Sequence, residues 1–98
     1  MALPAVVVSE SEAAVNGLIE QYIEQNPYKP GADEVRLIGY GVSVWALIAY
    51  LHAAGGDLQR AARAYDVPLA ALQAAVAYYE QHREIIDARI AANAPAAA

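Results

Sequence analysis

The chain has 98 residues, a length that fits one domain and is too short for two. It carries 6 basic and 11 acidic residues, a formal net charge of −5, so any nucleic-acid contact must come from a local basic patch or from a partner. The absence of cysteine excludes disulfides and thiolate chemistry. Hydrophobic residues make up 58% of the chain, and a monomer of this size has difficulty burying so much apolar surface. This excess predicts self-association.

Candidate catalytic and metal-ligating groups are scarce along the chain. The two histidines, His52 and His82, have no second ligand at metal-binding spacing, and the serines are better explained as helix caps than as nucleophiles. We therefore expect a non-enzymatic protein without metal or cofactor. Charges or glycines interrupt every apolar run before it reaches the length of a membrane span. We expect a cytoplasmic protein that does not contact membranes.

Residues 1–33 form an N-terminal extension with one amphipathic helix. Ser9 and Glu12 fit a capping box at its start, and the helix is predicted over Ser11 to Gln25. Asn26-Pro27 ends it, because a residue before proline avoids the helical region. Apolar residues recur on one face at three- and four-residue spacing: Val15, Leu18, Ile19, Tyr22 and Ile23.

Polar and apolar residues alternate over Glu34 to Ile38, which predicts a short strand. Gly39-Tyr40-Gly41 then resembles a hairpin turn that leads to Val42. The sequence therefore predicts a short β-hairpin before the next helix.

Two helices follow the predicted hairpin. The first is predicted to begin after Ser43 as its cap, to reach about Ala54 and to stop at Gly55. Its core stripe is Val44, Leu47, Ile48 and Leu51, whereas Trp45 and His52 lie on another side. Asp57 caps the second helix, Leu58 to Tyr65, and Asp66-Val67 breaks the pattern before Pro68.

From Pro68 the helical pattern continues to about Asn93, with residues 94–98 expected to fray. Its apolar seam alternates spacings of three and four, with one polar member: Leu69, Leu72, Val76, Tyr79, Arg83, Ile86 and Ile90. Two interpretations are compatible with this seam. One long helix lies on the globular core, or its C-terminal half pairs with a partner helix.

The stretch from Asp57 to Tyr79 has the pattern of a helix-turn-helix. A short capped helix with small residues Ala61 and Ala62 is followed by a tight break and a longer helix whose Leu72 and Val76 face inward. Many small helical bundles share this pattern. The start of the second helix offers only Gln73 for base edges, so we expect weak DNA binding at most. The candidate DNA contacts are Arg60, Arg63, Gln73 and Arg36.

The Trp45 helix is apolar on more than one face, and a helix of this kind is normally covered on more than one face. Together with the seam, this predicts a homodimer or a partner interface. The candidate interface residues are Trp45, His52, Tyr79, Arg83, Ile86 and Ile90. Taken together, the elements predict a mainly α protein: a small helical bundle with a helix-turn-helix-like core over residues 34–93, a short hairpin and a long C-terminal helix in one compact domain.

Three segments carry a resemblance to a known family: Gly41 to Leu51, the Gly56-Asp57 junction, and Ala75 to His82. Together they resemble the domain-of-unknown-function family 433, whose members resemble VapB-type antitoxins; the similarity covers about Glu34 to Asn93. It implies a homeodomain-like or winged-helix-like core and a partner that is a PIN-like ribonuclease toxin with an acidic metal site. In place of the family's usual glycine-threonine-arginine turn, this chain has Gly39-Tyr40-Gly41.

The sequence thus supports two functional hypotheses. The first is an antitoxin-like interaction protein that forms a homodimer, binds a toxin and contacts its own operator weakly. The second is a homodimeric structural or interaction module that does not bind nucleic acid.

Overall fold

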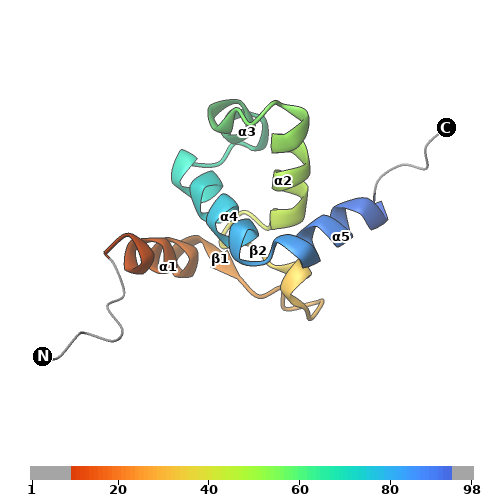
Figure 1. Cartoon of the computed structure of the whole chain (residues 1–98), viewed down its shortest axis with the longest axis horizontal. Helices are drawn as coiled ribbons and strands as arrows, with labels where there is room; N and C mark the ends of the chain where they lie inside the picture. The colour runs from red at the N-terminus through yellow and green to blue at the C-terminus, as the bar shows by residue number, and fades with distance from the viewer. Residues whose placement is uncertain (1–9, 94–98) are drawn as a thin grey trace, which may run out of the picture.

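The computed structural model describes residues 10–93 and is mainly helical, as the sequence predicts. Helices α2 (Val44–Ala53), α3 (Leu58–Tyr65) and α4 (Leu69–Gln81) form a central unit. Helices α1 (Glu10–Tyr22) and α5 (Arg83–Asn93) project from opposite sides of this unit (Figure 1). The predicted cap at Ser9 and the predicted fraying of residues 94–98 lie outside the described residues.

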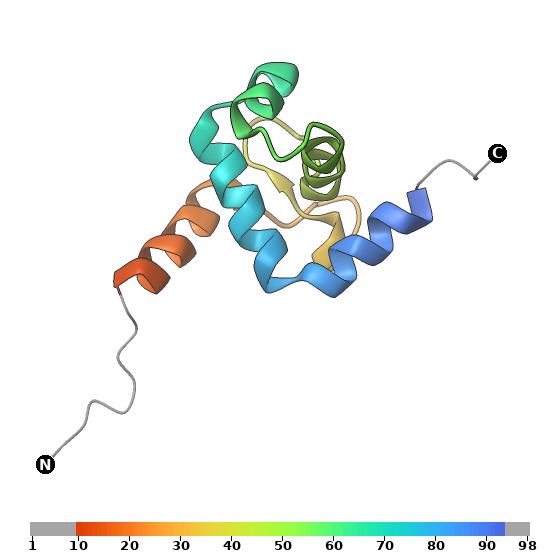
Figure 2. The same cartoon turned by 45° about the horizontal axis from the view of Figure 1, so that its top comes forward.

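Helix α1 ends three residues earlier than predicted, at Tyr22 rather than Gln25. The next two residues form β1 (Ile23–Glu24), which pairs antiparallel with β2 (Arg36–Leu37). Pairing with a strand twelve or more residues away therefore overrides the helical pattern of Ile23. Helix α1 then lies alongside α4 (Figure 2), with its partly buried Ile19 and Tyr22 packed against the core.

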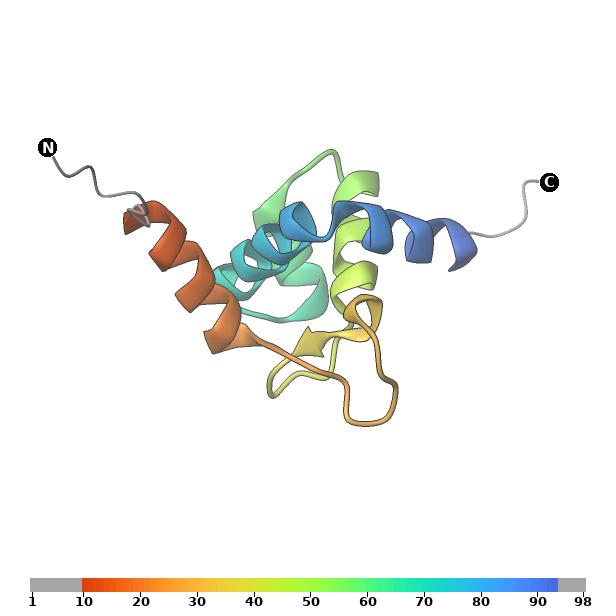
Figure 3. The ribbon, with the colours of Figure 1, turned by 60° about the horizontal axis from the view of Figure 1, so that its bottom comes forward.

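The predicted hairpin around Gly39-Tyr40-Gly41 is limited to a few backbone contacts across the turn. The Leu37 N–H donates to the Val42 carbonyl over 2.8 Å, and Arg36 forms an isolated bridge with Ser43. The main partner of the predicted strand is β1, not the residues after the turn. Together with the 3₁₀ turn η1 (Ala32–Glu34), this small sheet sits at the N-terminal end of α2 (Figure 3).

Helices α2 and α3 match their predicted bounds closely because local signals set their ends. Ser43 occupies the cap position of α2, although its side chain makes no capping hydrogen bond. At the other end, the Gly56 N–H donates to the Leu51 carbonyl and the Gly55 N–H to that of His52, with Gly55 at φ 70°. Asp57 caps α3 by accepting a hydrogen bond from the Arg60 N–H over 3.1 Å.

The helical stretch after Pro68 is not continuous, which corrects the expectation of one unbroken helix to Asn93. His82 has φ −132° and ψ 36°, outside the helical region, and separates α4 from α5. Across this break, α5 turns back toward α2 and η1 and packs on both. The predicted seam is therefore bent, because its second half completes the core of the same chain.

The core lies between α2, α3 and α4 and is closed by α5 on one side. All four residues of the predicted α2 stripe are buried, as are Ala61 and Ala62 of α3. The largest fully buried side chains come from β2, α2, α4, α5 and the segment before β2: Leu37, Leu47, Ile48, Leu72, Ile86, Val35 and Val44. Among residues 10–93, none of the helices has the length and apolar composition that crossing a bilayer requires.

Neighbouring isoleucines on α5 give a matched test of this packing. Ile86 has no exposed surface, whereas Ile85 is 41% exposed. Ile86→Ala should lower the free energy of unfolding by about 2–5 kcal/mol, because it leaves a cavity. Ile85→Ala should change it by less than about 0.5 kcal/mol. Urea denaturation of both variants measures the difference; equal effects would mean that α5 does not pack as described.

Candidate functional site

The turn between α3 and α4 is fixed by backbone hydrogen bonds. Asp66 adopts the left-handed conformation at φ 54°, and its N–H and that of Val67 donate to the carbonyls of Arg63 and Ala62. Pro68 precedes α4, and the small buried side chains of Ala61 and Ala62 let α3 pack on its neighbours. Together with α2, which precedes α3 in the chain, this arrangement has the helix order and the tight turn of a helix-turn-helix unit.

Arg60 and Arg63 lie on the exposed face of α3, close to one helical turn apart. Within residues 10–93 neither forms an ion pair. Gln73 is exposed on α4, on the same stripe as Leu69 and Glu80. That stripe offers one side chain able to read a base edge and one carboxylate that repels phosphate. The outer face of α3 is therefore the more suitable surface for an anionic partner.

Arg36 does not join the other candidate DNA contacts. It lies on β2, where its Nε donates to Glu24 over 2.9 Å and its guanidinium sits 5.6 Å from the centre of the exposed Tyr28 ring. β2 is at the N-terminal end of α2 and α3 follows its C-terminal end; the ten residues between span about 15 Å. Arg36 is thus both neutralised by Glu24 and remote from Arg60 and Arg63.

The six candidate interface residues are brought together where α5 folds back on α2. Trp45 and Ile90 are half-buried and pack against the core, and Ile86 is fully buried. His52 is exposed, with its ring edge-on to Tyr79 at 5.7 Å. Much of this set therefore makes contacts within one chain. In particular, Ile86 is buried in the core of the single chain, and its assignment to a partner interface stays a prediction.

Tyr79 is the centre of this cluster. Its hydroxyl donates to Asp87 of α5 over 2.7 Å, and the Arg83 guanidinium lies 5.0 Å from its ring centre. The hydrogen bond to Asp87 raises the pKa of Tyr79; burial and the charge of Asp87 add to the rise, and Arg83 opposes it. The Tyr79 side chain therefore links the end of α4 to α5, and its hydroxyl stays protonated.

Tyr78 performs a similar role toward η1. Its hydroxyl donates to the Ala32 carbonyl over 2.6 Å, and its ring stacks on His82 at 4.1 Å. Burial raises the pKa of Tyr78, and the charge of Asp33 adds to the rise. The His82 Nδ1 lies 3.1 Å from the Tyr78 carbonyl, so ring and backbone contacts both hold the break between the helices.

Arg89 is the principal contact that the sequence analysis missed. Its guanidinium bridges to Glu34 and, at 3.6 Å, to Asp33, and lies 4.9 Å from the Trp45 ring centre. These partners are more than forty residues away along the chain, so no local spacing could have indicated them. The one available signal was position: Arg89 borders the apolar stripe of Ile86 and Ile90.

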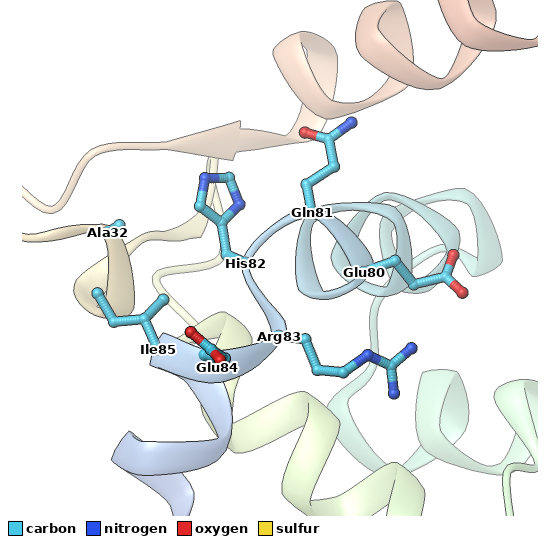
Figure 4. A pocket seen from close by; sticks show the side chains of 7 residues that line it. All are labelled: Ala32, Glu80, Gln81, His82, Arg83, Glu84 and Ile85. Atoms are coloured by element: carbon cyan, nitrogen blue, oxygen red, sulfur yellow. The ribbon is translucent and has the colours of Figure 1, made fainter.

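An open depression of about 480 Å³ lies at the break between α4 and α5 (Figure 4). Ile85 lies beside Ala32 at one end of it, and Glu80 and Arg83 lie at the other. Within the part of the chain that the structure describes, no three His, Asp or Glu side chains are grouped so that they could hold a metal ion.

Comparisons with protein-family models, with curated proteins and with solved structures found no match to this chain.

The raised pKa values of Tyr78 and Tyr79 predict alkaline destabilisation. The folded chain binds these protons more tightly than the unfolded chain, where the pKa of tyrosine is near its ordinary value of 10.0. This stabilisation is complete below that pH and is lost as the pH rises through the raised folded pKa. Tyr79→Phe should therefore flatten the fall in unfolding free energy above about pH 10. Urea denaturation at several pH values measures it.

Tyr28→Phe is the control for this experiment, because Tyr28 is 82% exposed. It should leave the alkaline fall as steep as in the parent chain. If Tyr79→Phe behaves in the same way, the Tyr79–Asp87 hydrogen bond does not contribute to folding.

Proposed function

We propose that the protein is an antitoxin-like interaction protein of a bacterial toxin–antitoxin pair, which works in the cytoplasm as a homodimer and binds its operator weakly. The observation that carries the proposal is the helix-turn-helix arrangement of α2, α3 and α4, with Arg60 and Arg63 exposed on α3. The resemblance of residues 34–93 to the domain-of-unknown-function family 433 supports the antitoxin part, since a PIN-like ribonuclease is the partner that it implies.

Charge supports a toxin as the principal partner. The chain has a formal net charge of −5, and Arg36 and Arg89 are neutralised in ion pairs. An enzyme that binds RNA must present a basic surface to the phosphates. An acidic protein is electrostatically complementary to such a surface, which accelerates association and favours correct orientation.

Operator binding by the free protein would be weak because few side chains are available to contact DNA. Two copies of Arg60 and Arg63 supply four phosphate contacts, and the exposed start of α4 adds only Gln73 for base reading. A toxin bound to the dimer would contribute further basic surface and hold two dimers on one operator. Affinity for DNA should then rise through multivalency.

The second candidate is a homodimeric module that never contacts nucleic acid. The exposed stripe of α4 favours it, since this stripe places Leu69 and Glu80 on either side of Gln73. Such a surface suits a protein partner better than a polyanion. The two candidates differ in whether α3 contacts DNA.

Toxin binding is tested by co-expression with the product of the neighbouring gene. A ribonuclease-like neighbour should co-purify with this protein, and its RNA cleavage should be inhibited in the complex. Active, unbound ribonuclease in the presence of an excess of the folded protein would contradict the antitoxin proposal.

DNA binding is tested by titration of the upstream promoter at several salt concentrations. The dimer should bind with a slope of log affinity against log salt of about −3 to −4. Arg60→Ala combined with Arg63→Ala should abolish this binding. Lys29→Ala removes one exposed positive charge outside α3 and should retain most of it. Binding of the promoter no better than random DNA, with or without the toxin, would leave the second candidate.

A further inference from the structure

The bend between α4 and α5 has no cause in the local sequence. The residues around it, Glu80 to Glu84, include no proline or glycine, the residues that normally break a helix. In addition, the apolar seam continues across the bend in register, from Leu72 and Tyr79 to Ile86. Local preference therefore favours one straight helix, and the bend must be imposed by tertiary contacts.

The tertiary contacts that hold α5 beyond the bend come from its docking. We call the surface of α2 and η1 that α5 covers the α5 groove; Trp45, Asp33 and Glu34 line it. Ile86 enters the core beside this groove, Arg89 bridges to its two carboxylates, and Asp87 accepts the hydrogen bond from Tyr79. These contacts are lost if α5 leaves the groove and nothing replaces it.

The backbone at the bend is less fully bonded than a helix would be. Across it, the His82 N–H donates to the carbonyls of Tyr78 and Tyr79, and the Ile86 N–H donates to the His82 carbonyl. A straight helix would also form the bonds from the N–H groups of residues 83–85 to the carbonyls of residues 79–81. Straightening is therefore favourable locally, provided that another helix fills the vacated groove.

We propose that two copies of this chain exchange α5. In each copy α4 and α5 become one continuous helix, and its end occupies the α5 groove of the other copy. This inference rests on the homodimer of the proposed function and specifies its interface. Only a second copy is certain to fit, because the groove already accommodates this helix, with an apolar side chain for the core and a cation for Asp33 and Glu34.

Exchange restores every contact of α5 between copies and adds the helical bonds at two hinges. Domain exchange of this kind is a low-cost route to a dimer. The equilibrium between this dimer and the monomer, in which α5 packs on its own chain, depends on the hinge and on protein concentration. In the straightened helix, the apolar residues of the seam would lie along one continuous face.

The first test changes the hinge. His82→Ala and His82→Gly both remove the ring that stacks on Tyr78, but alanine favours a helix over glycine by about fivefold per position. With two hinges per dimer, His82→Ala should dimerise about 25-fold more tightly than His82→Gly. Sedimentation equilibrium over a range of concentrations, with a monomer mass of 10.4 kDa, measures both constants.

The second test locates α5 by cross-linking. The chain has no cysteine, so Ala32→Cys and Ile85→Cys each introduce one thiol, and the two positions lie beside each other at the same end of the depression in Figure 4. When the two single variants are mixed, unfolded and refolded together, a short bis-maleimide should join an Ala32→Cys chain to an Ile85→Cys chain. Mixing Ala32→Cys with Ala64→Cys, whose thiol lies exposed on α3, is the control and should give little product.

Each outcome decides the exchange separately from the proposed function. A dimer with no cross-link between the two variants, and with equal constants for both His82 variants, overturns the exchange and leaves the homodimer. A monomer at all concentrations overturns both the exchange and the homodimer, whereas toxin binding is measured independently by co-purification.

Discussion

Helix α2 is the constraint on which the rest of the fold depends. Within Val44–Ala53, His52 is the only side chain that is not apolar or aromatic, so the helix must be covered on nearly every side. Helices α3 and α4 cover it from two directions, and α5 with η1 covers the side that carries Trp45. The bend at His82 is a consequence, because only a change of direction brings α5 of the same chain back to α2. This packing leaves one face of α3 and one face of α4 exposed, and these faces are available to partners.

Elements with local signals were predictable from the sequence, and so was the part of the candidate site that they carry. Asp57 as a cap and Gly55 as a stop define α3 and the end of α2 to within a residue, because the groups that satisfy the helix ends are neighbours in the chain. The exposure of Arg60 and Arg63 also follows from neighbouring residues. Ala61 and Ala62 of the same helix are buried, which turns the two arginines toward solvent.

Features that depend on distant residues were not predictable. Ile23 continues a helical pattern but forms a strand because Leu37 pairs with it, and the bend at His82 follows from contacts of Arg89 with residues more than forty positions away. Arg36 was grouped with the other arginines because the sequence gives no indication that Glu24 neutralises it. The burial of Ile86 in its own chain was not predictable, because the seam looks the same whether the partner is another copy or the same chain.

Helix α5 covers α2, whether it comes from the same chain or from another copy, and Trp45 reports on this packing directly. Trp45 is the only tryptophan; its indole Nε1 is buried, and the Arg89 guanidinium lies over the ring. Quenching of its fluorescence by acrylamide should therefore be weak in the folded chain and should increase strongly in urea. Arg89→Ala should increase it partly without unfolding the chain. Quenching in the folded chain as strong as in urea would mean that α5 leaves Trp45 open to solvent, and would contradict the account.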